Sequence, residues 1–140
     1  MFIDSVIWIA YKNRNDSWHQ KARDLLPSML ATSERAYVTD YIVLETVNHL
    51  LRRTAFGTAK ETLDMFLRSP RITTIYNEEN TFRQTYDLFA KYPGLSITDA
   101  NIVFHMLRLR ERILFSFDRG FDSVKEISRI EEGSGENTRD

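Results

Sequence analysis

Residues 96–122 read SITDANIVFHMLRLRERILFSFDRGFD, and this stretch contains both element types of the expected fold. Apolar residues recur at helical spacing over residues 97–109, which predicts a helix. Residues 113–117 form an apolar, aromatic-rich run that predicts a strand. Asp99 falls in the first turn of this helix, and Asp118 directly follows the strand. The stretch therefore predicts a helix and a strand that each carry an acidic residue at one end.

Outside this stretch, strands and helices continue to alternate along the chain. Short strands are predicted at residues 2–3, 37–39 and 72–76, which are rich in β-branched or aromatic residues. Helices are predicted over residues 5–11, from Asp16 or Ser17 to a stop near Pro27, over residues 40–53 with Asp40 as the cap, from a cap at Thr58, and from a cap at Asn77 to about residue 91. This alternation predicts an α/β fold whose parallel sheet is covered by helices on both faces.

Four acidic residues occupy positions that such a fold can bring together. Asp4 and Asp118 each follow a predicted strand, and ligand clefts in open parallel sheets lie at the carboxyl ends of the strands. Glu45 lies within the helix after the second strand, and Asp99 lies at a helix N-terminus, where the dipole offsets part of its charge. The four converge if the strands that precede Asp4 and Asp118 are neighbours. Because clustered carboxylates repel one another, this arrangement predicts a bound cation.

Each of these acids also has a purely structural explanation. Asp4 would cap the helix that follows it, Asp99 would interact with its own helix dipole, and Asp118 would begin a turn. Glu45 is the hardest to explain in this way, because an acid flanked by Leu44 and Val47 needs a partner if it is buried. The four acids together, and no single one of them, therefore indicate a site.

Composition restricts the remaining function classes. The chain has 140 residues, 42% of them hydrophobic and 28% charged, which suits one globular domain. The absence of cysteine excludes thiolate zinc sites and cysteine nucleophiles and fits a cytoplasmic location. Neither a signal peptide nor an apolar stretch of about 20 residues is found, so we expect no membrane association. The net charge of −1 supplies little long-range attraction for nucleic acid.

Other residues that carry chemistry receive no site role from the sequence. The histidines show no i,i+4 pairing with one another, which disfavours a histidine metal site; they are His19, His49 and His105. Asn101 is predicted to face another side of the helix from Asp99. Trp8 and Trp18 are expected to pack. No P-loop, no Asp-x-Asp after the first strand and no G-x-S-x-G segment is present.

Four short segments combine the acids with characteristic neighbours. They are Ile3-Asp4-Ser5, Val43-Leu-Glu45, Ser96-Ile-Thr-Asp99-Ala100 and Ser116-Phe-Asp118-Arg-Gly-Phe121-Asp122. In order, spacing and chain length they resemble the PIN domain, and more narrowly the VapC-type ribonuclease toxins of type II toxin–antitoxin systems. The resemblance covers residues 1–131 as a single domain. It implies a three-layer α/β/α sandwich with a mainly parallel sheet, followed by a flexible tail at residues 132–140.

The resemblance implies a metal-dependent endoribonuclease whose four acids hold Mg²⁺ or Mn²⁺. Asp4 and Asp99 would contact the ion directly, and Glu45 and Asp118 would complete the site or hold its waters. The ion would activate a water for in-line attack on an RNA phosphodiester. No side-chain nucleophile would be required.

Three further residues are candidate supporting groups. Ser5 and Ser116 would hydrogen-bond the carboxylates or a phosphate, or else serve as a helix cap and an ordinary strand residue. Asp122 would either assist Asp118 or cap the turn. We place Asp118 as the inner acid and Asp122 as the outer one.

The resemblance also implies partners. Besides the RNA substrate, it implies a small VapB-type antitoxin whose C-terminal segment would lie in the cleft, and homodimers are common in the family. Candidate partner-facing residues are Trp18, Leu25, Phe56 and Phe66, of which Leu25 and Phe66 are expected to be core. The alternative function is a PIN-fold module with weak catalysis that binds RNA or protein independently of metal.

Overall fold

The computed structural model describes residues 1–33 and 35–132, and over this range the chain forms a five-stranded, all-parallel sheet. The strand order is β3-β2-β1-β4-β5. The strands are β1 (Phe2–Ile3), β2 (Ala36–Thr39), β3 (Ile72–Ile75), β4 (Ile113–Phe115) and β5 (Ser128–Ile130). The predicted α/β class with a parallel sheet is confirmed.

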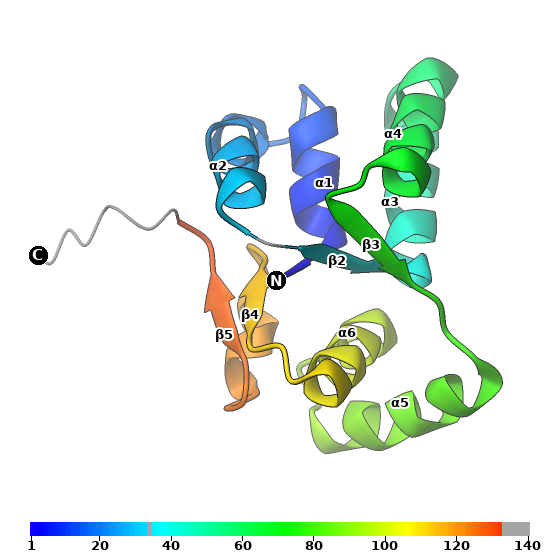
Figure 1. Ribbon diagram of the computed structural model, residues 1–140, viewed down its shortest axis with the longest axis vertical. Helices are drawn as coiled ribbons and strands as arrows, with labels where there is room; N and C mark the ends of the chain where they lie inside the picture. Colours follow the sequence, from blue (N-terminus) through cyan, green and yellow to red (C-terminus); the bar gives the residue numbers. More distant parts are fainter. Residues whose placement is uncertain (34, 133–140) are drawn as a thin grey trace, which may run out of the picture.

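Helices cover both faces of this sheet. They are α1 (Ser5–Lys12), α2 (His19–Thr32), α3 (Asp40–Arg53), α4 (Phe56–Arg68), α5 (Glu79–Lys91) and α6 (Ile97–Leu109), and a short 3₁₀ helix, η1 (Arg119–Ser123), precedes β5. Figure 1 shows α1 to α4 on one side of the sheet and the α5–α6 pair on the other. This is the three-layer α/β/α arrangement that the PIN resemblance implies. None of these helices is long and apolar enough to cross a membrane.

The central strands are short and apolar because both of their faces are covered. Phe2, Ile3, Leu114 and Phe115 are completely buried. Trp8 of α1 is also completely buried and packs edge-to-face on a ring of α4, that of Phe66, at a centroid distance of 5.1 Å. Such burial removes large apolar areas from water and dominates the stability of the fold.

The sheet order makes β1 and β4 neighbours, which is the condition for the acids to converge. Phe2 pairs with Leu114 and Ile3 with Phe115. The ladder then continues one residue further, because the Asp4 N–H donates to the Phe115 carbonyl at 3.0 Å. Asp4 and the segment that follows β4 therefore leave the sheet side by side at its carboxyl edge.

Several predicted boundaries are wrong by a few residues. Thr39, not Asp40, caps α3. Trp18 occupies the cap position of α2, and Pro27 lies inside this helix, which continues to Thr32. Such shifts are common where several polar residues compete to begin a helix.

Other boundaries and one strand also differ from the prediction. Helix α4 begins at Phe56, before the predicted cap at Thr58, and α5 follows Glu78, not Asn77. Strand β5 was not predicted, because its three residues include two polar ones and carry no alternation signal. The predicted tail at residues 132–140 lies, apart from residue 132, outside the described residues.

A carboxylate cavity at the carboxyl edge of the sheet

Asp4 lies at the centre of the candidate site, between the sheet and α1. It is 5% exposed. Its Oδ1 accepts the Ser5 N–H at 2.8 Å, which caps α1, and its Oδ2 accepts the Ser116 hydroxyl at 2.8 Å. The cap that the sequence offers as a structural explanation is therefore real. It leaves the second carboxylate oxygen inside the fold, bonded to Ser116.

Ser116 links two of the acids through a single oxygen. Its Oγ donates to Asp4 and accepts the Asp118 N–H at 3.0 Å. Asp118 in turn caps η1, because its Oδ1 accepts the Gly120 N–H at 2.8 Å. A Cβ on Gly120 would lie 3.0 Å from the Gly94 carbonyl oxygen and 3.1 Å from Asp118 Oδ1. The turn therefore needs glycine for close approach.

Helices α3 and α6 supply the other two acids. The Ser5 hydroxyl donates to Glu45 Oε2 at 3.0 Å. Glu45 is exposed, so the condition under which it would need a buried partner is not met. Asp99 forms a capping box with Ser96, in which Ser96 Oγ accepts the Asp99 N–H at 3.1 Å and Asp99 Oδ2 accepts the Ser96 N–H at 3.2 Å. Hydrogen bonds thus hold both acids in place, Glu45 through Ser5 and Asp99 through Ser96.

One cavity of about 400 Å³ brings all four acids together. Its walls are Asp4, Ser5, Val6, Trp18, Glu45, Ser96, Asp99, Phe117 and Asp118. A second cavity, of about 270 Å³ between α1, α2 and α4, is lined by apolar side chains and Arg71 and contains no carboxylate. The chemistry that a cavity can perform depends on its polar groups, so the carboxylate cavity is the candidate site.

The acids of this cavity are not neutralised by basic side chains. Within residues 1–33 and 35–132, none of the four forms an ion pair. Burial raises the pKa of Asp4 to about 7; the charges of Asp99 and Glu45 act in the same direction, against the hydrogen bonds from Ser116 and Ser5. Burial, with the charges of Asp118 and Glu45, also raises the pKa of Asp99. Clustered acids of this kind are typical of functional sites.

The donor set suits a hydrated divalent ion. Every polar side chain of the cavity offers oxygen, the ligand that Mg²⁺ and Mn²⁺ prefer. In the described part of the chain, no three acidic or histidine side chains converge closely enough to enclose an ion by themselves. An ion bound among these oxygens would therefore need waters as further ligands, which Mg²⁺ usually keeps.

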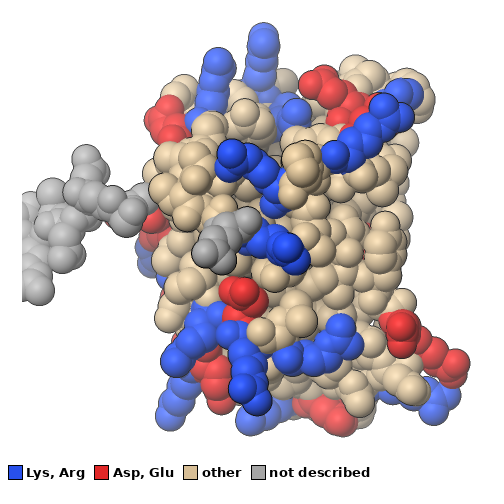
Figure 2. Space-filling view, viewed as in Figure 1, with Lys and Arg blue, Asp and Glu red and all other residues tan. Residues whose placement is uncertain are grey.

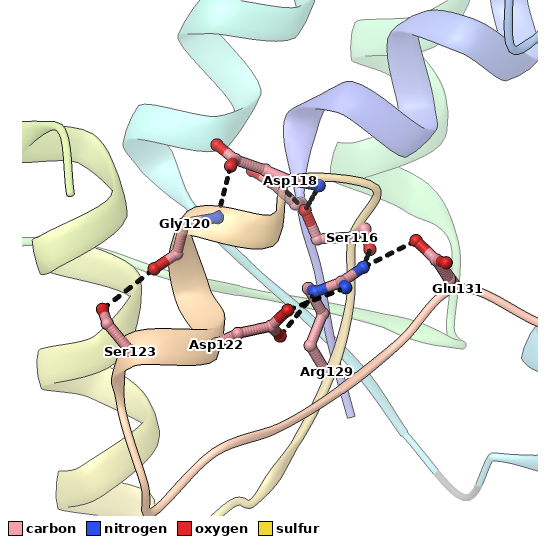
Figure 3. Close-up of polar contacts among 8 residues, drawn as sticks. Ser116, Asp118, Gly120, Asp122, Ser123, Arg129 and Glu131 are labelled. Atoms are coloured by element: carbon pink, nitrogen blue, oxygen red, sulfur yellow. Dashed lines mark hydrogen bonds and ion pairs between the residues drawn. The ribbon is translucent and has the colours of Figure 1, made fainter. Parts of the chain in front are cut away.

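Asp122 lies outside this cavity, in a separate cluster. Figure 3 shows Arg129 between Asp122 and Glu131, with Ser116 beside it. Arg129 donates from Nε and Nη2 to Asp122 at 2.9 and 3.1 Å, and from Nη1 to Glu131 at 2.8 Å and to the Ser116 carbonyl at 3.1 Å. Arg129 lowers the pKa of both carboxyls through these bonds. Asp122 therefore holds β5 to the turn and faces no cavity acid.

A buried polar network accounts for Asn101 and His105. Asn101 is completely buried and donates to Asn77 at 2.7 Å and to Thr85 at 3.0 Å. The ring of His105 lies 2.8 Å from the same Asn77 oxygen, and Asn77 also bonds Asp40. Sequence reasoning gave Asn101 no role, and its role here is to join α6 to α5 and to the segment after β3.

Two aromatic residues of the cavity were missed by the sequence reasoning. Trp18 was expected to pack like Trp8, yet it is 43% exposed and lies against Phe117 in the cavity wall. The only available signal was its position directly before a helix and next to polar residues. Of the other partner-facing candidates, Phe66 is core as expected and Leu25 packs against the core, whereas Phe56 is 70% exposed.

Surface charge is mixed. Figure 2 shows Lys and Arg at the upper and lower margins of the face seen in Figure 1 and also near its centre, with Asp and Glu among them. This distribution fits the net charge of −1. Attraction of a polyanion would therefore depend on particular basic side chains and not on the net charge of the protein.

Comparison with solved structures places the fold among toxin–antitoxin proteins. VapC20 of Mycobacterium tuberculosis, described as a sarcin–ricin-loop-cleaving toxin, superposes with a TM-score of 0.78 at 20% identity over 89% of this chain and 94% of that one. VapBC2 of Rickettsia felis, solved with promoter DNA, gives 0.67 at 12% identity over 92% and 96%. A toxin–antitoxin complex of Klebsiella pneumoniae gives 0.65 at 15% identity over 91% and 94%.

Sequence comparison gives the family. No protein of curated function matches the chain in sequence. The sequence profile of the PIN domain, in contrast, matches residues 1–127, which include all four cavity acids and both serines that hold Asp4. With its parallel sheet, its two helical layers and its carboxylate cavity, the chain belongs to the PIN domain family.

Proposed function

We propose that this protein is a Mg²⁺- or Mn²⁺-dependent endoribonuclease that acts as a VapC-like toxin. The observation that carries the proposal is the carboxylate cavity, in which four acids share a space of about 400 Å³ and no basic side chain of residues 1–33 and 35–132 forms an ion pair with them. A fold that keeps such repulsion loses stability unless a cation restores it. The toxin named as cleaving the sarcin–ricin loop has the same fold and supports RNA as the substrate.

The four acids would bind the ion in two different ways, according to how deeply each is buried. Asp4 and Asp99 are the direct ligands, since their carboxylates are the more buried of the four. Glu45 and Asp118 would hold waters of the ion. When bound, the ion lowers the pKa of a water and offsets charge on the phosphate oxygens during in-line attack.

Ser116 and Ser5 position the acids and do not react. Ser116 fixes Asp4 relative to Asp118 through its two hydrogen bonds, and Ser5 does the same for Asp4 and Glu45. The leaving 3′ or 5′ oxygen would take its proton from solvent, because the described residues that line the cavity include no histidine or lysine. Fixed positions at low reorganisation cost are the main contribution that the protein makes to such a reaction.

A VapB-type antitoxin, homodimer formation and a cytoplasmic location are part of the same proposal. Two of the structures with this fold are toxin–antitoxin assemblies. An inhibitor that places a basic side chain among the four acids would supply the missing positive charge and occupy the ion site. The exposed ring of Phe56 on α4 remains a candidate contact for such a partner or for a second copy.

The test is cleavage of a mixed RNA pool by purified protein with Mg²⁺, Mn²⁺ or EDTA. We expect metal-dependent cutting that Asp4→Asn and Asp99→Asn abolish. Asp87→Asn, an exposed acid on α5, is the matched control and should cut like the wild type. Folding of each variant is checked by circular dichroism.

The other outcomes separate the alternatives. Cutting that survives both Asp4→Asn and Asp99→Asn, or EDTA, would come from a contaminant or another site. A folded wild type that cuts nothing but binds RNA or protein without metal would instead be a PIN-fold binding module.

A further inference from the structure

An aromatic pair lines the carboxylate cavity, and an ammonium group lies beside its two rings. The rings of Trp18 and Phe117 stack with centroids 4.8 Å apart and planes 21° apart. Lys21 Nζ lies 5.3 Å from the Trp18 centroid and 5.2 Å from that of Phe117. Both rings are cavity walls beside the four acids. None of these three side chains is used by the proposed carboxylate chemistry.

The pair is held in place before any ligand binds. Phe117 is only 8% exposed and packs edge-to-face on the completely buried Phe115 at 6.0 Å. On the other side, Asp16 Oδ1 accepts the Trp18 N–H at 2.9 Å. The His19 ring lies 2.7 Å from the Ala10 carbonyl and so ties the start of α2 to α1. Such preorganisation reduces the entropy lost when a ligand binds.

One face of Trp18 remains open. The three distances of 4.8, 5.2 and 5.3 Å form a nearly equilateral triangle, so the ammonium lies beside the stacked pair. It does not cover the face of Trp18 that points away from Phe117. That Trp18 is still 43% exposed agrees with this geometry. A flat aromatic group can therefore extend the stack by one ring.

The neighbouring charges favour a ligand that is an aromatic ring joined to an anion. Lys21 supplies positive charge beside two wall residues of an acidic cavity, and after Arg129 it also helps to lower the pKa of Glu131. A phosphate bound beside these rings needs such compensation. Because the Lys21 ammonium already occupies the position beside the rings, a basic side chain of a protein partner would gain less cation–π attraction there. Unpaired nucleotides offer both features, since every base has a stacking face and carries a phosphate.

We propose that Trp18, Phe117 and Lys21 form a nucleobase-stacking subsite for an unpaired nucleotide next to the scissile phosphate. Trp18 stacks on the base, Phe117 supports Trp18 from the core, and Lys21 contacts the phosphate. This subsite rests on the proposed ribonuclease function and adds a substrate class to it. The preferred substrate is single-stranded or looped RNA, because a base inside a duplex cannot reach Trp18.

The first experiment measures binding without cleavage. A short 2′-O-methyl oligoribonucleotide is titrated against the same oligonucleotide with one central abasic site, in the presence of Mg²⁺. Wild type should bind the complete oligonucleotide about tenfold more tightly, since stacking contributes roughly 1–3 kcal/mol per base. Binding should quench the fluorescence of Trp18, while the buried Trp8 stays unaffected.

Three variants separate stacking from structure and charge. Trp18→Ala should lose the preference for the complete oligonucleotide, and Trp18→Phe should restore most of it but lose the quench. Lys21→Ala should weaken both oligonucleotides equally and reduce the salt dependence of binding. Tyr86→Ala, which removes a 64% exposed ring on α5 outside the cavity wall, is the control and should bind like the wild type.

Cleavage of single-stranded RNA gives a second readout. Trp18→Ala should raise KM about tenfold with kcat nearly unchanged, because the base is held equally in the ground and transition states. Equal affinity of wild type for the complete and abasic oligonucleotides, or unchanged binding by Trp18→Ala, would overturn the subsite. Loss of binding to a protein partner alone in Trp18→Ala would assign the aromatic pair to that partner and would also overturn it.

The subsite and the ribonuclease function can fail separately. If wild type cuts RNA and Trp18→Ala keeps its KM, the subsite fails and the nuclease stands. If wild type cuts nothing with any metal but still prefers the complete oligonucleotide with quenching, the stacking subsite stands and the nuclease fails.

Discussion

Carboxylates on the two sides of Ser116 have opposite surroundings. On one side, Arg129 is paired with Asp122 and Glu131, and the pKa of both carboxyls is lowered. On the other side, Asp4 and the other cavity acids form no ion pair within the described part of the chain, and burial raises the pKa of Asp4 to about 7. The first cluster stabilises the fold by itself, whereas the second lowers stability until something positive binds. Neutralisation, more than acidity, therefore distinguishes structural acids from site acids here.

Serine 116 connects the two clusters. Its carbonyl accepts from Arg129 at 3.1 Å, and its hydroxyl donates to Asp4 at 2.8 Å. Arg129 thus holds Ser116 through its backbone carbonyl, and the Ser116 hydroxyl is left to bond Asp4. Figure 3 shows Ser116 beside Arg129. The cluster around Arg129 therefore supports Ser116, which in turn holds Asp4. Residues of a functional site need such rigid support.

The largest expected effect comes from removing charge in the cavity. Asp4→Asn should lower RNA cleavage at saturating Mg²⁺ by at least about 100-fold, because the most buried ligand no longer attracts the ion. Asp122→Asn should lower cleavage by less than about threefold, since its carboxylate faces Arg129. Rates are measured under single-turnover conditions. Similar losses in the two variants would show that the two clusters are not functionally distinct.

The same substitution should raise stability in metal-free protein. The pKa of Asp4 in the fold is about 7, above its ordinary 3.8, so the native state binds more protons than the unfolded state between about pH 4 and pH 7. Raising the pH through this window therefore lowers the free energy of unfolding. The Asp4→Asn variant has no carboxyl at this position to ionise, so it does not lose stability in this way. It should be more stable than the wild type by about 2–4 kcal/mol above pH 7, with no gain below about pH 4.

The measurement is urea unfolding in EDTA from pH 3.5 to 8. Asn keeps both hydrogen bonds of Asp4, because its oxygen can accept from Ser5 and its amide can donate to Ser116. Charge is therefore the main difference between the two proteins. An Asp4→Asn variant that is less stable than wild type at pH 8 would mean that the carboxylate is compensated in the metal-free fold.

Breaking the cluster of Arg129, Asp122 and Glu131 should, in contrast, lower the stability of the protein. Arg129 is 9% exposed and holds Asp122, Glu131 and the Ser116 carbonyl. Arg129→Ala should cost about 1–3 kcal/mol, since it leaves a carbonyl and two carboxylates without their donor. Arg129→Lys should recover only part of this, because an ammonium cannot reproduce the forked contact with Asp122.

The acid limb of the stability curve gives an independent check of that cluster. Lowered pKa values mean that Asp122 and Glu131 stabilise the fold when ionised, so their contribution is lost as the pH falls through the folded-state values, below about pH 4. Arg129→Ala should flatten this limb and leave the limb between pH 4 and 7 intact. Arg83→Ala, which removes an exposed pair with Glu79, should change neither limb measurably.

Sequence reasoning identified the elements of this fold more reliably than their contacts. Strands 2–3 and 113–115 were readable because parallel strands buried on both faces are continuously apolar. Helix caps were misplaced where polar residues compete: the Asp40 side chain bonds Asn77 and does not cap α3, and Asn77 belongs to the network around Asn101. Nothing local in the sequence indicates which distant polar group will complete such a network.

The acids of the site were predictable and their surroundings were not. Asp4 and Asp118 follow strands, and strand adjacency alone brings them to one edge. Glu45 follows Leu44 in an apolar stretch of sequence, yet both residues are exposed on α3. Trp18 reaches the cavity only through the packing of α2 against α1. Tertiary contacts of this kind leave no periodic pattern in the sequence.

The smallest expected effect tests how closely the turn after β4 is shaped around Asp118. A methyl group on Gly120 would lie 3.0 Å from the Gly94 carbonyl oxygen and 3.1 Å from Asp118 Oδ1, so both neighbours would have to shift. Gly120→Ala should cost about 1 kcal/mol in urea unfolding and weaken Mn²⁺ binding measured by calorimetry. Gly57→Ala places the same methyl group in open space at the start of α4 and should stabilise the protein by about 0.5 kcal/mol. If Gly120→Ala matches Gly57→Ala in both stability and Mn²⁺ affinity, the turn tolerates a side chain and Asp118 does not depend on its close contact with residue 120.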